Sequence, residues 1–204
     1  MENYKKNLEL LTKNHVYSKE MEHDACGVGL IASTEGKKSR AIVEYGIEAL
    51  KAVWHRGAVD ADGKTGDGAG IHVEIPKDFF IEKIQVTGHD YDNSEICVGM
   101  IFLPRNDYSA QESCKTIVES ELTKNNFSIY GWRQVPVNPK VLGEKALQTM
   151  PEIIQVLFKS NDTNLLDKNL ERKIYETRKR IENKAFNASL NNFYICSISS
   201  KSII

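Results

Sequence analysis

Cys26 is the residue whose type and neighbours most clearly suggest chemistry. It begins the stretch Cys-Gly-Val-Gly-Leu-Ile-Ala-Ser, in which Gly27 precedes an apolar run and Gly29 lies within it. Glycines weaken the interior of a strand, but they allow a backbone to approach another molecule closely. A thiol that must reach a substrate gains from this setting, so Cys26 is a candidate nucleophile. On the residues alone a structural role stays open, because such cysteines are more often structural than catalytic.

The backbone itself could supply the base for this thiol if the bond between Ala25 and Cys26 were cleaved. A free α-amino group has a pKa of about 7.7–8, compared with about 10.4 for lysine. It is therefore partly neutral near pH 7 and able to accept the proton of the thiol on the same residue. Residues 1–25 are polar, with only a weak helical pattern, and we treat them as a leader before a domain of residues 26–204.

The glycine-rich stretch at residues 58–70 fails the common nucleotide and calcium motifs on spacing. A phosphate-binding loop needs a glycine five residues before Gly63, and that position is Ala58. An EF-hand fails because Lys64 and Thr65 stand where an oxygen ligand and a glycine are required. A dinucleotide fingerprint fails because the glycines precede a predicted strand instead of a helix. We therefore expect neither a nucleotide nor a calcium ion here.

The other three cysteines, Cys97, Cys114 and Cys196, lie far apart in apolar or helical stretches and form no Cys-x-x-Cys pair. This pattern predicts separate thiols in a reducing compartment, each buried as a small hydrophobic residue. His23 and Cys26 have the spacing of metal ligands, but no second pair accompanies them. The sequence therefore predicts no metal site in this chain.

The elements that must position these residues follow from hydrophobic periodicity. We predict a helix over residues 39–57, with Ser39 as its N-cap and Gly57 as its C-terminal stop. Pro76 is expected to open a short turn over residues 76–80, followed by a polar connector. Further helices are predicted at 107–126 and 164–185, and strands at 26–33, 71–75, 95–104, 127–137, 152–160 and 193–199. Strands that alternate with helices indicate a layered α/β (α+β) fold.

Composition excludes several classes of partner. The 204 residues are 41% hydrophobic and 27% charged, which is ordinary for a globular protein. The net charge of -1 gives no electrostatic reason to expect nucleic acid or an anionic membrane as a partner. No apolar run approaches the roughly 18 residues of a membrane span, and the first residues resemble neither a secretory signal nor a transit peptide.

Two blocks then resemble a known family. They are Ala-Cys-Gly-Val-Gly-Leu-Ile-Ala-Ser at residues 25–33 and His-Arg-Gly-Ala-Val-Asp-Ala-Asp-Gly-Lys-Thr-Gly-Asp-Gly-Ala-Gly-Ile at residues 55–71. They are similar to the amino-terminal glutaminase domain of glutamate synthase large subunits, which is a class II glutamine amidotransferase. The similarity continues through residues 131–138, 151–158, 175–182 and 193–203, so it covers nearly everything from about His23 onward.

The resemblance implies a fold, a reaction and two site residues. The fold would be the N-terminal-nucleophile hydrolase αββα sandwich, incomplete at its C-terminus. Residues 1–25 would be a propeptide, and Cys26 would attack the side-chain amide of L-glutamine to give a γ-glutamyl thioester and ammonia. Arg56 would bind the substrate α-carboxylate through its planar guanidinium. The alternative for Arg56 is a cation that stabilises the C-terminal end of a helix dipole.

The resemblance also implies partners that lie outside this chain. In the family, ammonia passes to a second site where 2-oxoglutarate is converted to glutamate with FMN and a 3Fe-4S cluster, so no cofactor is expected in this chain. The partners would be the remaining domains of the same polypeptide and either ferredoxin or a pyridine-nucleotide-dependent small subunit. The many Lys, Asn and Ile residues suit a gene from an AT-rich algal plastid or a cyanobacterium, and such a source would favour ferredoxin as the electron donor. The protein would be cytoplasmic or, if plastid-encoded, in the plastid stroma.

The family's oxyanion-hole residues would lie beyond Ile204. An oxyanion hole contributes on the order of 10²–10³ in rate. We therefore expect this sequence to be a fragment of a longer product and a poor or inactive glutaminase when isolated. Two other interpretations stay open at this point: a different class II amidotransferase, and a non-catalytic remnant that packs against a partner.

Overall fold

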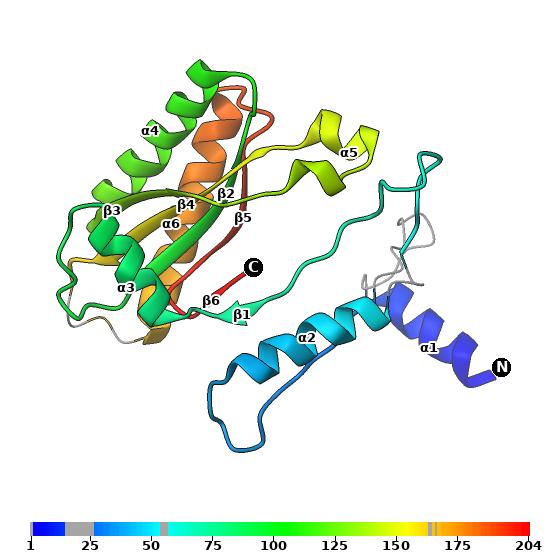
Figure 1. The fold of residues 1–204 in the computed structure, drawn as a ribbon. Coiled ribbons are helices and arrows are strands. Elements are labelled where there is room, and N and C mark those ends of the chain that lie inside the picture. The colour runs from blue at the N-terminus through cyan, green and yellow to red at the C-terminus, as the bar shows by residue number, and fades with distance from the viewer. Residues whose placement is uncertain (1, 15–26, 54–56, 163–164, 166) are drawn as a thin grey trace.

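The main body of the protein is a four-stranded antiparallel sheet. A computed structural model of the 204-residue chain describes residues 2–14, 27–53, 57–162, 165 and 167–204. The sheet has the strand order β3-β4-β2-β5. Its strands are β2 (Cys97–Leu103), β3 (Phe127–Gln134), β4 (Glu152–Ser160) and β5 (Tyr194–Ser199). A second, two-stranded sheet pairs β1 (Val73–Glu74) with β6 (Ser202–Ile203) (Figure 1).

Two long helices, α4 (Tyr108–Lys124) and α6 (Asp167–Asn187), cover one face of the four-stranded sheet (Figure 1). The Asp107 carboxylate caps α4 by accepting a hydrogen bond from the Ala110 N–H at 2.9 Å. The larger hydrophobic core lies between these helices and the sheet. It includes Cys97, Ile101, Leu103, Cys114, Val118, Leu122, Phe127, Val156, Phe158, Ile174, Ile181 and Ile195.

The opposite face of the sheet packs against a shorter helix, α3 (Lys77–Val86), and the two-stranded sheet. Phe80 and Ile84 lie one turn apart on α3, and both are buried against this face. The second core comprises Ile75, Phe80, Ile84, Ile96, Val98, Tyr130, Leu157 and Ile203. The four-stranded sheet is therefore covered on both faces, as expected for a layered fold.

Two β-bulges adjust which side chains face each core. On β3, Ile129 pairs with Phe158 and Gly131 pairs with Leu157, so Tyr130 is an extra residue. The extra residue allows Ile129 and Trp132, three positions apart, to pack on the same core. Gly131 has φ 146°, a backbone conformation that side-chain-bearing residues rarely adopt. On β5, Cys196 is the extra residue in the pairing with β2.

Helix α2 (Arg40–Ala52) lies on the far side of the two-stranded sheet from the main body (Figure 1). A Cβ atom at Gly46 would lie 3.2 Å from Ile71 Cδ1, so the helix and the start of the β1 segment are in close contact. Lys38, just before α2, pairs with Glu74 of β1 at 2.6 Å. These contacts hold α2 against the short sheet.

The predicted strand at residues 26–33 is wrong for the described residues 27–33, which have no regular secondary structure. Val28 and Leu30 are 89% and 90% exposed. A strand requires hydrogen bonds to a neighbouring strand, and none of the described strands pairs with this segment. The segment is near α2, because a Cβ at Gly29 would lie 4.0 Å from Ala49 Cβ.

Most of the other predicted elements are confirmed. β2, β3, β4 and β5 lie within the strands predicted at 95–104, 127–137, 152–160 and 193–199, and α4 and α6 correspond to the two long predicted helices. The strand predicted at 71–75 is confirmed only as the two residues of β1. The mixed α/β class is likewise confirmed, with antiparallel sheets.

Two predicted boundaries are wrong. Ser39 does cap α2, since its Oγ accepts a hydrogen bond from the Ile42 N–H at 3.4 Å, but the helix ends at Ala52 and not at Gly57. Residues 76–80 do not form an isolated turn, because Pro76 is the N-cap of α3. Proline is well tolerated at the start of a helix, and the buried pair Phe80 and Ile84 supplies the apolar face that extends it.

Three further helical segments complete the described structure. Helix α1 (Glu2–Lys13) falls in the predicted leader, and a 3₁₀ turn (Pro139–Val141) and α5 (Glu144–Thr149) lie in the long connection from β3 to β4. This connection carries α5 away from the sheet, toward the loop that follows α2 (Figure 1). No helix in the described part of the chain has the length and apolar character needed to cross a membrane.

Candidate active site

The two predicted site residues, Cys26 and Arg56, lie outside the described residues. Nothing in the structure tests their roles, so both stay predictions. The described residues that adjoin them in the sequence are residues 27–33 and the loop at residues 57–70. The second of these segments has a defined internal geometry.

The loop at residues 57–70 is closed by hydrogen bonds between its two arms. The Ala58 N–H donates to Asp67 Oδ2 at 2.8 Å, and the Asp60 N–H donates to the Thr65 carbonyl at 2.7 Å. Val59 and Gly66 form an isolated antiparallel bridge between these two contacts. The loop is therefore a short hairpin-like structure and not an open connection.

Asp62 organises the tip of this hairpin. Its Oδ1 accepts hydrogen bonds from the N–H groups of Lys64 at 2.9 Å and Thr65 at 2.7 Å, and its Oδ2 accepts one from Thr65 Oγ1 at 2.5 Å. The Thr65 hydroxyl, the backbone N–H groups of Thr65 and Lys64, and the backbone of Glu144 hold the pKa of Asp62 well below its usual range. The carboxylate is therefore ionised at neutral pH, and its oxygens are already engaged.

The hairpin is tied to α5, which is far away in the sequence. Lys145 Nζ lies 2.6 Å from Asp60 Oδ2, and the Ala146 N–H lies 3.5 Å from Thr65 Oγ1. The composition of this stretch predicts only a loop and does not indicate this contact. The Asp-x-x-Thr spacing at residues 62–65 was an available signal for a side-chain-stabilised turn, but nothing in the spacing indicates α5 as its partner.

The three described cysteines are poor nucleophiles. Cys97 and Cys114 are fully buried, and Cys196 is half-buried. Burial raises the pKa of Cys114 to about 11, and burial likewise raises the pKa values of Cys97 and Cys196. A raised thiol pKa leaves little thiolate at neutral pH. The prediction that these cysteines act as small buried side chains is confirmed for Cys97 and Cys114, and Cys196 faces the interior only in part.

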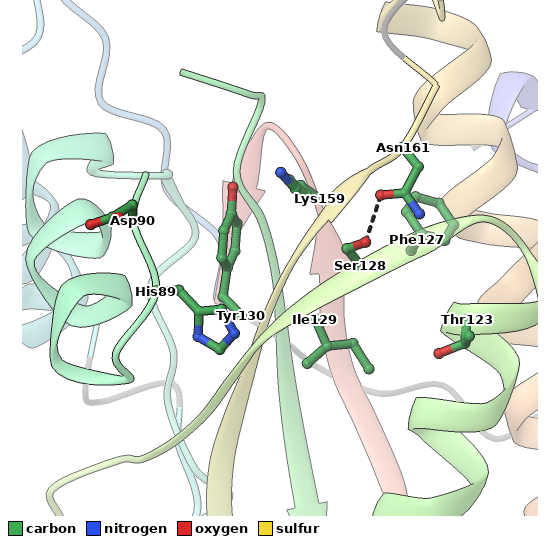
Figure 2. A pocket seen from close by; sticks show the side chains of 9 residues that line it. All are labelled: His89, Asp90, Thr123, Phe127, Ser128, Ile129, Tyr130, Lys159 and Asn161. Carbon is green, nitrogen blue, oxygen red and sulfur yellow. Dashed lines mark hydrogen bonds between the residues drawn. The ribbon is translucent and has the colours of Figure 1, made fainter. Parts of the chain in front are cut away.

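An open depression of about 500 Å³ lies at one end of β3 and β4 (Figure 2). It is lined by His89, Asp90, Thr123, Phe127, Ser128, Ile129, Tyr130, Lys159 and Asn161. Figure 2 shows the Tyr130 ring between His89 and Lys159, and the hydrogen bond of 2.6 Å from Ser128 Oγ to Asn161 Oδ1.

Two polar groups that line this depression, Tyr130 and Lys159, both bind Asp92 in the loop before β2. The Tyr130 hydroxyl donates to Asp92 Oδ1 at 3.1 Å, and Lys159 forms an ion pair with Asp92 Oδ2. Hydrogen bonds from Lys159, Ser94 and Tyr130 hold the pKa of Asp92 well below its usual range, while burial and the Asp92 carboxylate raise the pKa of Tyr130. This network stabilises the loop before β2 against the sheet. The Asp92 carboxylate and the Tyr130 hydroxyl are already hydrogen-bonded to each other.

No group of three His, Cys, Asp or Glu side chains among the described residues is arranged to hold a metal ion. The loop at residues 57–70 is acidic, but Asp60 is paired with Lys145 and Asp62 accepts backbone hydrogen bonds. The arrangement can therefore fix the shape of the loop that follows Arg56 in the sequence.

Comparison with known proteins adds the missing context. The model of the family "Glutamine amidotransferases class-II" matches residues 26–204. The chain is 52% identical over 201 residues to the glutamate synthase [NADPH] large chain of Azospirillum brasilense. The matched region covers 98% of this chain and 13% of that protein. It is 39% identical over 199 residues to the ferredoxin-dependent glutamate synthase of Pyropia yezoensis, with 96% of this chain and 13% of that protein covered.

A third similarity extends the pattern to plants. The chain is 38% identical over 186 residues to the chloroplastic ferredoxin-dependent glutamate synthase of Spinacia oleracea, which covers 90% of this chain and 11% of that protein. The chain thus spans little more than a tenth of the length of these relatives.

Proposed function

The chain belongs to the class II glutamine amidotransferases, and from this membership we propose that it is the glutamine-hydrolysing part of a glutamate synthase. The observation that carries the proposal is the 52% identity to a glutamate synthase large chain across 98% of the chain. Relatives that use ferredoxin are similar over nearly the same residues. This breadth favours glutamate synthase over an amidotransferase that delivers ammonia to another acceptor.

Cys26 is the proposed nucleophile, acting as the first residue of the mature domain after removal of residues 1–25. Its free α-amino group accepts the thiol proton, and the sulfur attacks the side-chain carbonyl carbon of glutamine. The carbon–nitrogen bond breaks, and the nitrogen leaves as ammonia after taking up a proton. Water then hydrolyses the γ-glutamyl thioester, which releases glutamate and restores the thiol.

Two observations support this assignment. The family match begins at residue 26. The remaining cysteines have raised pKa values: Cys97 and Cys114 are buried in the hydrophobic core, and Cys196 is partly buried. Neither burial nor a raised pKa suits a thiol that must ionise next to a polar substrate.

Arg56 is the proposed ligand of the glutamine α-carboxylate. An arginine is always charged at physiological pH, and its planar fork can donate two parallel hydrogen bonds to a carboxylate. Support comes from its place in the sequence, between α2 and the ordered hairpin at residues 57–70. Both neighbouring segments have defined contacts, which suits a residue that must be held in place.

We propose that the domain is a four-layer αββα sandwich of the N-terminal-nucleophile hydrolase type. In this arrangement α4 and α6 form one outer layer and the four-stranded sheet forms the first inner layer. The pair β1 and β6 begins the second sheet, and α2 lies outside it. The position of α2 across β1 from the main body supports this assignment (Figure 1).

The rest of the proposed glutamate synthase lies outside this chain. There FMN and a 3Fe-4S cluster would supply the electrons for forming glutamate from 2-oxoglutarate and ammonia. Ferredoxin, or a small subunit that uses a pyridine nucleotide, would be the electron donor. We place the protein in the cytoplasm, or in the plastid stroma if the gene is plastid-encoded.

The experiment that tests the proposal is labelling of the purified chain with 6-diazo-5-oxo-L-norleucine, a glutamine analogue that alkylates nucleophilic cysteines. Intact-mass spectrometry follows both the removal of residues 1–25 and the addition of one analogue. A second preparation begins with Met followed directly by Cys26, so that removal of the initiator methionine exposes the same amino group. Peptide mapping then locates the modified residue.

We expect one analogue per chain, located on Cys26 and prevented by excess L-glutamine. Cys26→Ser should abolish the label, whereas the matched control Cys196→Ser should keep it. Labelling of another cysteine would overturn the assignment of the nucleophile. Labelling needs a reactive thiol but not full turnover, so it applies even to the poor glutaminase that the isolated chain is expected to be. A chain with a free Cys26 amino group that does not react would therefore identify a non-catalytic remnant.

A further inference from the structure

We propose that the contact between the hairpin at residues 57–70 and the start of α5 positions the hairpin for glutamine capture, with Asp62, Thr65 and Gly143 as the positioning residues. We call this contact the hairpin–α5 junction. The inference rests on the proposed glutaminase function and adds to it a determinant of substrate binding 87 residues after Arg56 in the sequence, since Gly143 and Arg56 differ by 87 positions.

Gly143 shows how tightly the two segments are packed. A Cβ atom at this position would lie 2.2 Å from Thr65 Oγ1, 2.4 Å from Asp62 Oδ2 and 2.5 Å from Thr65 N. All three distances are far below a van der Waals contact. The hairpin thus occupies the space that any side chain at residue 143 would need.

The backbone conformation of Gly143 does not itself require glycine. Its φ of -71° and ψ of 165° are open to any residue. The need for glycine therefore comes from the close approach of another segment, and not from a left-handed turn. One of the clashing atoms is the Thr65 backbone nitrogen, so trimming a side chain could not relieve the contact.

Asp62 links the two sides of the junction through one carboxylate. On the hairpin side it accepts hydrogen bonds from the Lys64 and Thr65 N–H groups and from the Thr65 hydroxyl. On the α5 side it interacts with the backbone of Glu144. The ion pair between Asp60 and Lys145 is a second connection between the same segments.

The junction connects the hairpin to the four-stranded sheet through α5. Helix α5 lies in the connection between β3 and β4, and β4 pairs with both β2 and β3 in the main sheet. At the other end of the hairpin, the Ala58 N–H donates a hydrogen bond to Asp67. Ala58 follows Arg56 by only two residues. Fixing the hairpin therefore restricts the backbone that leads from the proposed carboxylate ligand.

The test compares Gly143→Ala with Gly70→Ala. Gly70 follows Asp67, at which the hydrogen bonds of the hairpin end, so it takes no part in the junction. A Cβ at Gly70 would meet only Ile204 Cγ2 at 3.7 Å, an ordinary contact, so this variant is a matched glycine-to-alanine control. For each chain, the rate of labelling by 6-diazo-5-oxo-L-norleucine is measured against analogue concentration. This separates the apparent inhibition constant KI, which reports capture, from the maximal rate kinact, which reports the thiol chemistry.

Gly143→Ala should raise KI by about tenfold and change kinact by less than about twofold, because it displaces a positioning element and not the nucleophile. Thr65→Val should behave similarly, whereas Thr65→Ser keeps the hydroxyl and should lie much closer to the parent. A general loss of structure would lower kinact together with capture and would not be rescued by serine. Unchanged KI in both Gly143→Ala and Thr65→Val would overturn the inference.

Amide hydrogen exchange provides a readout that does not depend on labelling. The Ala58 and Thr65 amides, which donate to Asp67 and Asp62, should exchange faster in Gly143→Ala than in Gly70→Ala. Equal exchange in the two variants would show that the junction does not order the hairpin, and would also overturn the inference. Failure of the parent chain to label at all would instead count against the proposed function.

Discussion

Lys145 Nζ lies 2.6 Å from Asp60 Oδ2 and joins two positions 85 residues apart. The lysine side chain is 64% exposed and the aspartate side chain 32% exposed. Because exposed ion pairs are screened by solvent and salt, we expect Lys145→Ala to reduce the free energy of unfolding by only about 0–1 kcal/mol. Urea denaturation at low and high salt checks this. A loss well above that range, or one insensitive to salt, would contradict it.

Gly99 lies in the middle of β2, where both faces of the sheet are covered. A Cβ there would lie 2.8 Å from Val156 Cγ1 and 3.5 Å from two Ile198 carbons. We expect Gly99→Ala to lower the free energy of unfolding by about 1–3 kcal/mol through overpacking. Thermal and urea denaturation measure the change. The Gly70→Ala control should stay within about 0.5 kcal/mol of the parent, and a similar loss in both variants would refute the packing argument.

Cys97 and Cys114 should resist alkylation in the folded protein. Both thiols are fully buried, and burial raises their pKa values, so little accessible thiolate exists at neutral pH. Iodoacetamide at pH 7.5, followed by peptide mass spectrometry, should modify them only after unfolding in urea. Rapid modification of Cys97 without denaturant would show that the sheet opens to solvent far more readily than its packing indicates.

Tyr130 should make stability fall at alkaline pH. Burial and the nearby Asp92 carboxylate raise the pKa of Tyr130 above the value of about 10 that tyrosine has in an unfolded chain. The contribution of Tyr130 to the free energy of unfolding is therefore fully present below about pH 10, and it is lost as the pH rises toward the pKa of Tyr130 in the folded protein. Tyr130→Phe should lower stability at pH 8 but make it less dependent on pH above 10.

Urea denaturation at pH 8 and at pH 10.5 measures this pH dependence. Tyr108→Phe is the control, since the Tyr108 side chain is 79% exposed. If Tyr130→Phe and Tyr108→Phe show the same change between the two pH values, the network of Tyr130, Asp92 and Lys159 does not couple to folding.

Arg56→Lys should weaken glutamine capture more than it slows thiol chemistry. A lysine keeps the charge but loses the two-pronged geometry that matches a carboxylate. The KI for the glutamine analogue should rise by about tenfold while kinact changes little. An unaltered KI would assign Arg56 to the alternative role, a cation near the end of α2.

The fold could be predicted from the sequence where periodicity and burial agree. β2 is a continuous apolar run, and β4 is apolar from Ile153 to Phe158 except at Gln155, because the sheet is covered on both faces. Helix α6 repeats its apolar residues at helical spacing. Helix α3 was missed because its buried face consists of little more than Phe80 and Ile84. The strand expected at residues 26–33 failed because an apolar pattern does not supply a hydrogen-bonding partner.

The candidate site was only partly predictable. The residue types indicated Cys26, and the block at residues 55–71 resembled a known family closely enough to suggest Arg56. The role of Asp62 depends on atoms of Thr65 and Glu144, and that of Gly143 depends on a hairpin nearly 80 residues earlier. Such contacts arise from tertiary packing, so no local pattern in the sequence encodes them.

The bulge at Tyr130 has a consequence for how molecules of this protein meet one another. β3 is an edge strand of the four-stranded sheet, and an edge strand offers unpaired amide and carbonyl groups to any passing chain. The extra residue, together with Gly131 at φ 146°, breaks the even spacing of those groups midway along the strand. A foreign strand could match only half of the edge at a time, which protects the protein against aggregation by sheet extension.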